Sequence, residues 1–161
     1  MIINGYSINP LSELTQTEQL MVLEWRNHPN VREWMYNSEI ISIESHFNFI
    51  ESLKNDLYNK YFLVQKENQN IGVIYYNKID MLDKSLYLGL YAHPLERQKG
   101  DGQHLLQTAI GYAFDTLKIE RIKLEVLSHN TAAVHLYKKF NFKVIEEKHD
   151  ILHMELQHEN R

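Results

Sequence analysis

The spacing of apolar residues changes once along the chain, near Tyr61. Before that point apolar side chains recur at three- and four-residue intervals, which is typical of helices with one buried face. The pattern predicts a short strand before Pro10 and then three helices. The first helix contains the apolar residues Leu20, Val22, Leu23 and Trp25 and ends before Pro29. The second contains Val31, Trp34 and Met35. The third follows Ser42 as N-cap and contains Phe47, Ile50 and Leu53.

After Tyr61 the pattern changes to runs rich in β-branched and aromatic residues, separated by turn residues. We expect strands at 61–64, 71–76, 85–92 and 119–127, and a closing hairpin of 144–147 with 151–156. Amphipathic patterns predict helices at 105–117 and 130–140. This order of elements indicates an α/β (α+β) domain with one central sheet flanked by helices.

Length and composition narrow the class of protein. The 161 residues carry no internal repeat and no linker, so we expect one domain, residues 1–161. With no cysteine, disulfides, thiolate zinc sites and cysteine nucleophiles are excluded. A net charge of −4 disfavours nucleic acid as the partner. Without a signal peptide or an apolar run of about 20 residues, we expect a cytoplasmic protein with no membrane partner.

A glycine-containing loop precedes the helix at 105–117 and reads Arg97-Gln98-Lys99-Gly100-Asp101-Gly102. Backbone amides at such a helix start converge on one anion, and Arg97 and Lys99 add positive charge. The sequence fits neither the nucleotide triphosphatase loop nor the G-x-G-x-x-G fingerprint. A tight turn without a ligand is the structural alternative; otherwise the loop predicts a pyrophosphate site for a molecule other than ATP or NAD.

A second motif follows the strand at 119–127, with Asn130, Ala133, Leu136, Tyr137 and Phe142 in the pattern N-x-x-A-x-x-L-Y-x-x-x-x-F. Together with R-x-x-G-x-G it resembles the acetyl-CoA signature of the GNAT superfamily of N-acetyltransferases. The resemblance implies a mixed, mostly antiparallel sheet splayed between its fourth and fifth strands, with pantetheine beside the fourth. Acetyl-CoA is then the co-substrate, and no metal is expected.

The same resemblance implies which residues bind the cofactor. They are Leu90, Tyr91, Ala92, Arg97, Gln98, Lys99, Gly100, Asp101, Gly102, Gln103, Asn130 and Ala133. Asp101 departs from the family pattern, which usually has an apolar residue there, and places a negative charge near the phosphates unless it faces away. Asn130 is also a good helix N-cap by residue type, and both roles are compatible.

Two residues are candidates for the chemistry of acetyl transfer. Tyr137 lies where the family commonly has its general acid, and a phenol with a pKa of about 10 can donate to a thiolate whose thiol has a pKa of about 8.5. Its structural alternative is half of a Leu-Tyr core pair. Glu125, on the predicted fifth strand, is the candidate base acting through water; an ordinary charged strand position is equally compatible with its sequence context.

The first half, about 1–60, is expected to select the acceptor, and about 61–161 to form the sheet and bind acetyl-CoA. The run W-R-N-H-P…W-M-Y…H-x-x-F resembles a GNAT branch that acetylates the 4-amino group of a UDP-linked amino-dideoxy sugar in pseudaminic acid biosynthesis, for flagellin glycosylation. The residues that this resemblance implies for substrate binding are Arg26, Met35, Tyr36, His46, Asn77, Lys78 and Tyr91.

Other acceptors stay open at this point. The W-R-N element also occurs in relatives that acetylate ribosomal protein N-termini or polyamines, and a non-catalytic acyl-CoA-binding sensor is a third alternative. Among the nine histidines, His149 and His153 are interpreted as surface residues, and His104 and His135 are given no role. The assembly is expected to be a monomer or a homodimer.

Overall fold

The computed structural model describes residues 1–161, and its strands form one sheet of eight. The strands are β1 (Ile2–Ile3), β2 (Tyr6–Pro10), β3 (Lys60–Lys66), β4 (Gln69–Asp80), β5 (Ser85–Ala92), β6 (Arg121–Leu127), β7 (Lys143–Lys148) and β8 (Ile151–Gln157). Their spatial order is β1-β2-β3-β4-β5-β6-β8-β7. Every neighbouring pair is antiparallel except β5 with β6, which is parallel. The mixed, mostly antiparallel sheet is therefore confirmed.

The helices begin and end near the predicted places. They are α1 (Gln16–Asn27), α2 (Pro29–Arg32), α3 (Ile43–Leu53), α4 (Asp101–Gly111) with a π-helical continuation (Tyr112–Thr116), and α5 (Thr131–Lys139); single 3-10 turns occupy Leu11–Glu13 and His158–Asn160. The Ser42 hydroxyl accepts the amide of Ser45, so the predicted N-cap of α3 is confirmed. None of the helices is long and apolar enough to cross a lipid bilayer.

Two expectations were wrong in detail. The second helix ends at Arg32, so Trp34 and Met35 lie in the turn after it. The helix begins after the N-cap His28, with Pro29 as its first residue. Its four residues complete only one turn. The chain also begins with β1, which was missed because a two-residue strand has no measurable period, whereas β2 confirms the short strand predicted before Pro10.

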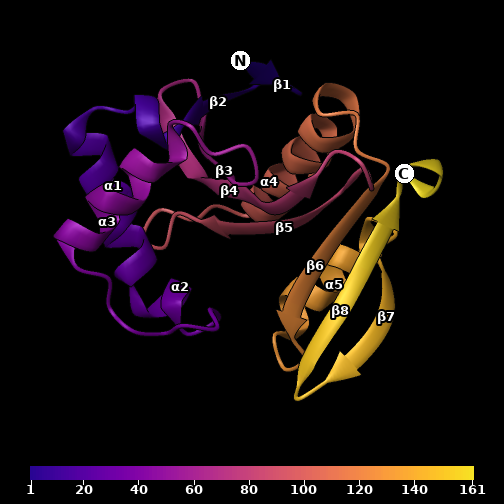
Figure 1. Cartoon of the computed structure of the whole chain (residues 1–161). Coiled ribbons are helices and arrows are strands. Elements are labelled where there is room, and N and C mark those ends of the chain that lie inside the picture. Colours follow the sequence, from indigo (N-terminus) through magenta and orange to yellow (C-terminus); the bar gives the residue numbers. More distant parts are fainter.

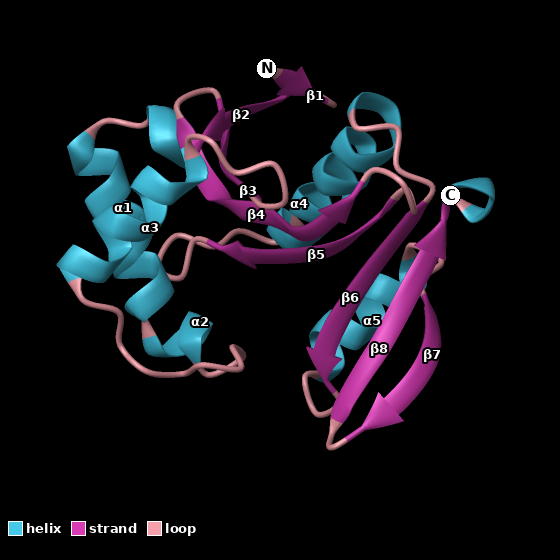
Figure 2. Cartoon of the chain, in the orientation of Figure 1, coloured by secondary structure: helices cyan, strands magenta, loops and turns pink.

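The sheet buries a different set of side chains on each face, as alternation along a strand requires. Phe62, Val64 and Ile74 belong to the larger core, which α4 and α5 cover. Leu63 and Val73, which are register partners on β3 and β4, belong to a second core beneath α1 and α3. Figure 2 shows these two helix layers on opposite sides of the sheet.

The family resemblance predicted a splay between the strands at 85–92 and 119–127. These are β5 and β6, and the splay lies between them. These strands pair only over Ser85–Tyr87 with Arg121–Lys123, at one end. Beyond that point β6, β8 and β7 diverge from β5 and take α5 with them (Figure 1). The remaining lengths of both strands therefore face an opening rather than each other.

Candidate active site

The free side of β5 is the first element of the site. The amide of His93, just after the strand, donates to the carbonyl of Ile71 in β4 at 2.9 Å. Because backbone groups alternate in an antiparallel pair, those of Leu90 and Ala92 point away from β4 and toward the opening. The backbone of Tyr91 points the other way, to β4. Of the three residues, Leu90 and Ala92 therefore have main-chain groups available to a pantetheine chain.

The loop after β5 ends in a helix start that leaves amides free. Gly100 is the N-cap residue of α4 and has a φ of +91°, a left-handed conformation that favours glycine. The amides of Gly102 and Gln103, in the first turn, have no acceptor in the chain. Free amides and the helix dipole together make an anion site there.

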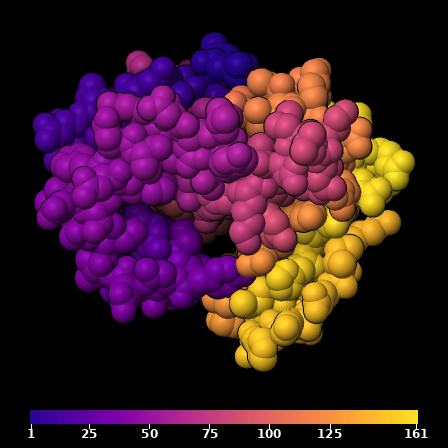
Figure 3. Space-filling model, in the orientation of Figure 1, coloured from indigo at the N-terminus to yellow at the C-terminus, as the bar shows by residue number.

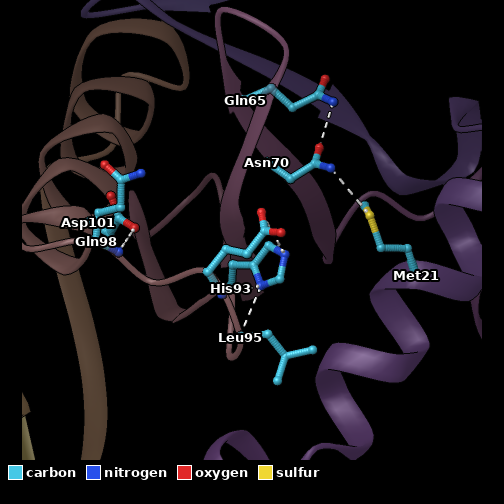
Figure 4. A network of polar contacts seen from close by, with 8 residues as sticks. Met21, Gln65, Asn70, His93, Leu95, Gln98 and Asp101 are labelled. Carbon is cyan, nitrogen blue, oxygen red and sulfur yellow. Dashed lines mark hydrogen bonds and ion pairs between the residues drawn. The ribbon is translucent and has the colours of Figure 1, made fainter.

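The side chain of Asp101 faces the loop rather than the solvent. It is 8% exposed, and its Oδ2 accepts the amide of Gln98 at 2.8 Å (Figure 4). Asp101 therefore closes the turn and occupies the Gln98 amide, leaving Lys99, Gly100, Gly102 and Gln103 as the amides for an anion. His93 stabilises the other end of the loop, since its Nδ1 accepts the amides of Leu95 and Glu96 at 3.1 and 3.2 Å.

The remaining residues predicted for the cofactor surround this loop. Arg97 and Lys99 are exposed, and the Arg97 guanidinium lies beside Gly102. The Gln103 side chain accepts from the Lys139 ammonium at 2.9 Å, which joins α4 to α5. Asn130 caps α5 through the Ala133 amide at 3.4 Å, so the capping interpretation is confirmed. The two motifs, the loop before α4 and the start of α5, are thus joined to each other through Gln103 and Lys139.

Tyr137 projects from α5 and is 8% exposed. Its ring packs 5.7 Å from that of Phe142, and its hydroxyl forms no hydrogen bond within the chain. Burial raises the pKa of Tyr137 to about 12, so its phenol stays protonated at neutral pH. Ionisation of Tyr137 would raise the pKa of Tyr75 further, which indicates that the two phenols are near each other. Tyr137 belongs to the larger core, and its protonated, unpaired phenol has the properties of a proton donor.

Glu125 lies on β6 and connects both halves of the molecule. Its Oε2 accepts the Tyr36 hydroxyl at 2.5 Å, across 89 residues of sequence, and its Oε1 lies 3.5 Å from His153 Nδ1 on β8. Burial, followed by this hydrogen bond, raises the pKa of Tyr36, so Tyr36 is the donor. Nearby, the rings of Trp34 and His129 lie 5.5 Å apart. The segment after α2 thus reaches β6 directly.

A row of tyrosines crosses the sheet next to this segment. Tyr61 and Tyr75 are register partners whose rings stack at 4.8 Å and 3°, and Tyr91 follows at 6.4 Å from Tyr75. Gly89 makes room for the row, because a Cβ there would lie 2.1 Å from the Tyr75 ring. Burial raises the pKa of all three phenols, so they act as neutral hydrogen-bonding groups.

Arg26, on α1, points into the tyrosine row. Its Nη2 donates to the Asn37 carbonyl at 2.8 Å, whereas its Nη1 is buried without a partner. The guanidinium lowers the pKa of Tyr61, Tyr75 and Tyr91, partly opposing burial, so its charge lies close to all three phenols. A buried guanidinium nitrogen without a partner is costly unless an anion or acceptor completes its hydrogen bonds.

The other residues predicted for substrate binding occupy different surroundings. The Met35 sulfur lies 3.9 Å from the Tyr75 hydroxyl, and Asn77 accepts from Tyr61 at 3.2 Å. The Lys78 ammonium lies 5.0 Å above the Tyr87 ring. His46 is separate: it is 5% exposed, and its Nε2 lies 2.7 Å from the Gln19 carbonyl of α1. We therefore interpret His46 as holding α3 against α1 and leave it out of the acceptor site.

Figure 3 shows a hollow at the centre of this face of the molecule. Violet surface from the N-terminal part borders it on one side, and orange and yellow surface from the C-terminal part borders it on the other. Sequence reasoning missed Tyr61, Tyr75 and His153. The tyrosines fall on one face only through the register of β3, β4 and β5, which the sequence does not give. For His153 no signal existed either, since its contact depends on the β6–β8 pairing.

Comparison with known proteins supports one family. The model of the acetyltransferase (GNAT) family matches residues 17–142. The curated acetyltransferase PseH of Campylobacter jejuni (strain 81-176) is 37% identical over 143 residues, covering 89% of this chain and 88% of that protein. The crystal structure of Campylobacter jejuni PseH in complex with acetyl coenzyme A has a TM-score of 0.80 at 32% identity, covering 95% and 99% of the two chains.

A spermidine N-acetyltransferase from Vibrio cholerae, solved with CoA and spermine, has a TM-score of 0.86 at 20% identity over 97% of both chains, a likeness of fold alone. The chain belongs to the GNAT acetyltransferase family. It is an acetyl-CoA-dependent N-acetyltransferase with acetyl-CoA as co-substrate, as the two motifs predicted.

Proposed function

We propose that this enzyme acetylates the 4-amino group of a UDP-linked 4-amino-4,6-dideoxy-N-acetyl-altrosamine, a step of pseudaminic acid biosynthesis for flagellin glycosylation. The observation that carries the proposal is the buried, unpartnered Nη1 of Arg26 beside three tyrosines. A nucleotide sugar brings both a diphosphate for a cation and rings for an aromatic surface. The 37% identity to PseH supports the same assignment.

Each half of the acceptor then has a candidate partner. Arg26 binds the diphosphate or uracil oxygens, assisted by Lys78 and by Asn77 and Tyr91 at the same surface. Met35 and Tyr36, in the segment after α2, contact the sugar. Because Tyr36 also donates to Glu125, a sugar bound against Tyr36 has its amino group near that carboxylate.

For the reaction we propose direct attack of the amine on the bound thioester, since the chain has no cysteine to carry an acetyl group. Glu125 takes a proton from the ammonium form through water, which frees the nitrogen lone pair. The C–N bond forms, the C–S bond breaks, and Tyr137 gives its proton to the departing thiolate. The second proton lost by the nitrogen restores the Tyr137 phenol, so the products are an amide and CoA–SH.

Leu90 and Ala92 hold the pantetheine arm in this proposal, and the loop at 97–103 holds the pyrophosphate. Asn130 and Ala133, at the start of α5, line the opposite side of the opening. Lys99, Gly100, Gly102 and Gln103 supply amides, with the charges of Arg97 and Lys99 at the entrance. The carboxylate of Asp101 is turned into the loop, so it does not oppose the phosphates.

The acceptor is tested by offering the purified protein acetyl-CoA with the UDP-amino sugar, spermidine or a ribosomal-protein N-terminal peptide, each in turn. We expect mass spectrometry to find acetylation of the sugar, and UDP to inhibit in competition with the sugar but not with acetyl-CoA. A polycation needs carboxylates around it, whereas the surface that we assign to the nucleotide carries the guanidinium of Arg26, with its buried, unpartnered Nη1. Acetylation of spermidine with no reaction of the sugar would overturn the assignment.

A further inference from the structure

His153 has a place in the site that neither motif predicts. It lies on β8 directly opposite Glu125 on β6, and its Nδ1 lies 3.5 Å from Glu125 Oε1. The other carboxylate oxygen, Oε2, is occupied by the Tyr36 hydroxyl. Oε1 is therefore the oxygen that remains for a proton, and the imidazole is the base next to it.

The exposure of this pair suits proton exchange with water. The His153 side chain is 33% exposed and that of Glu125 is 26% exposed, so both reach solvent. The charged groups that face His153 come from each neighbouring strand: Glu125 on β6, Glu146 in register on β7, and Glu155 two positions along β8. Glu155 is opposite Lys123 and pairs with Arg121 at 3.7 Å. Tyr36 faces the pair from across the opening.

A base that works once per turnover has to lose the proton that it gains. If Glu125 takes a proton from the acceptor ammonium, the hydrogen bond from Tyr36 closes one route for releasing it. His153 offers the other route, because one ring nitrogen faces Oε1 while the second can transfer a proton to water.

We propose that His153 is a positioning and proton-relay residue that acts through Glu125. This inference rests on the proposed function, specifically on Glu125 as base. The ammonium gives one proton through water to Glu125, and the protonated carboxyl passes it to the imidazole. The imidazolium then releases it to solvent, so Glu125 returns to its carboxylate and His153 to its neutral form, with no other reactant consumed.

The test compares His153→Ala with His135→Ala, which removes an exposed histidine of α5 that forms no hydrogen bond or ion pair with Glu125. We expect kcat of H153A to fall about tenfold, the lower end of what acid–base groups contribute, with unchanged KM for the sugar and unchanged Kd for acetyl-CoA. Added imidazole restores kcat in proportion to its concentration. H135A keeps the wild-type kcat with and without imidazole.

Glu125→Gln separates this inference from the proposed function. If His153 acts only through Glu125, the double variant E125Q/H153A is no slower than E125Q, whereas H153A/Y137F loses the product of the single effects. The relay is overturned if kcat of H153A stays within twofold of wild type, or falls without imidazole rescue and equally in the E125Q background. Wild-type kcat in E125Q overturns both the base and the relay; an impaired E125Q beside an active H153A overturns the relay alone.

Discussion

The two sides of the hollow that we propose for acetyl-CoA and for the acceptor are built by different means. On the acetyl-CoA side, the main chain provides the groups: the unpaired backbone of Leu90 and Ala92 and the amides at the start of α4. On the acceptor side, side chains from four separate segments meet, including Arg26, Tyr36, Tyr75 and Glu125. A backbone site depends on a short local sequence, whereas a side-chain site depends on the packing of the whole domain.

The two sides meet at Tyr137, and its removal is the largest expected effect. Tyr137→Phe keeps the ring against Phe142 but removes the proton donor, so we expect kcat to fall about 10²–10³-fold with acetyl-CoA affinity unchanged. Because the pKa of Tyr137 is raised to about 12, wild-type kcat should show no loss from this group between pH 7 and pH 9. Acetylation assays between pH 7 and pH 9 measure kcat of Tyr137→Phe and the pH dependence of wild-type kcat, with Tyr112→Phe as the buried-tyrosine control. A Y137F enzyme with full kcat would exclude the acid role.

Arg26→Lys should affect only the acceptor side. Lysine keeps the charge but loses the planar fork, so we expect KM for the UDP-sugar to rise about tenfold, while Kd for acetyl-CoA stays the same. Arg32→Lys is the matched control: Arg32 also donates to backbone carbonyls of this region, at 3.1 and 3.2 Å, but has no buried unpaired nitrogen. Equal effects of the two substitutions would mean that Arg26 serves only to hold the segment after α2.

Substitution of Gly89 and Gly102 by alanine should have smaller effects, and each should affect a different side of the hollow. In Gly89→Ala the new methyl would collide with the Tyr75 ring, so we expect about 1–3 kcal/mol less stability, a lower Tm and a raised sugar KM. In Gly102→Ala the nearest atom lies 3.4 Å away, which is ordinary contact, so Tm should hold while acetyl-CoA binding weakens. Thermal melts and titrations with acetyl-CoA decide; a G89A protein with native Tm and KM would show that the tyrosine row is adaptable.

Asp101 gives the smallest expected effect. Asp101→Ala removes the acceptor of the Gln98 amide, and a lost hydrogen bond of about 1 kcal/mol should weaken acetyl-CoA about fivefold through a looser loop. Asp101→Asn keeps an acceptor oxygen and removes the negative charge, so affinity should stay equal or rise slightly. Isothermal titration of both variants checks this, and weakening in D101N as large as in D101A would assign the effect to charge instead.

Much of the fold follows from local signals. The N-cap of Ser42, the stop before Pro29 and the amphipathic repeat after Gly102 placed α1, α3 and α4 within a few residues, because capping and periodicity act within one or two turns. The length of α2 and the existence of β1 were not predictable in this way. Both elements are too short to have a period, and pairing or capping decides where they end.

By itself, the sequence determined the family and predicted the acetyl-CoA loop and the role of Tyr137, because the residues of each motif lie close together in the chain. Only the tertiary structure decided that Asp101 turns into the loop, that His46 is buried against α1, and that Tyr36 and His153 flank Glu125. The physical reason is range: a hydrogen bond across 89 residues exists only after the sheet has its register, and no local pattern encodes it.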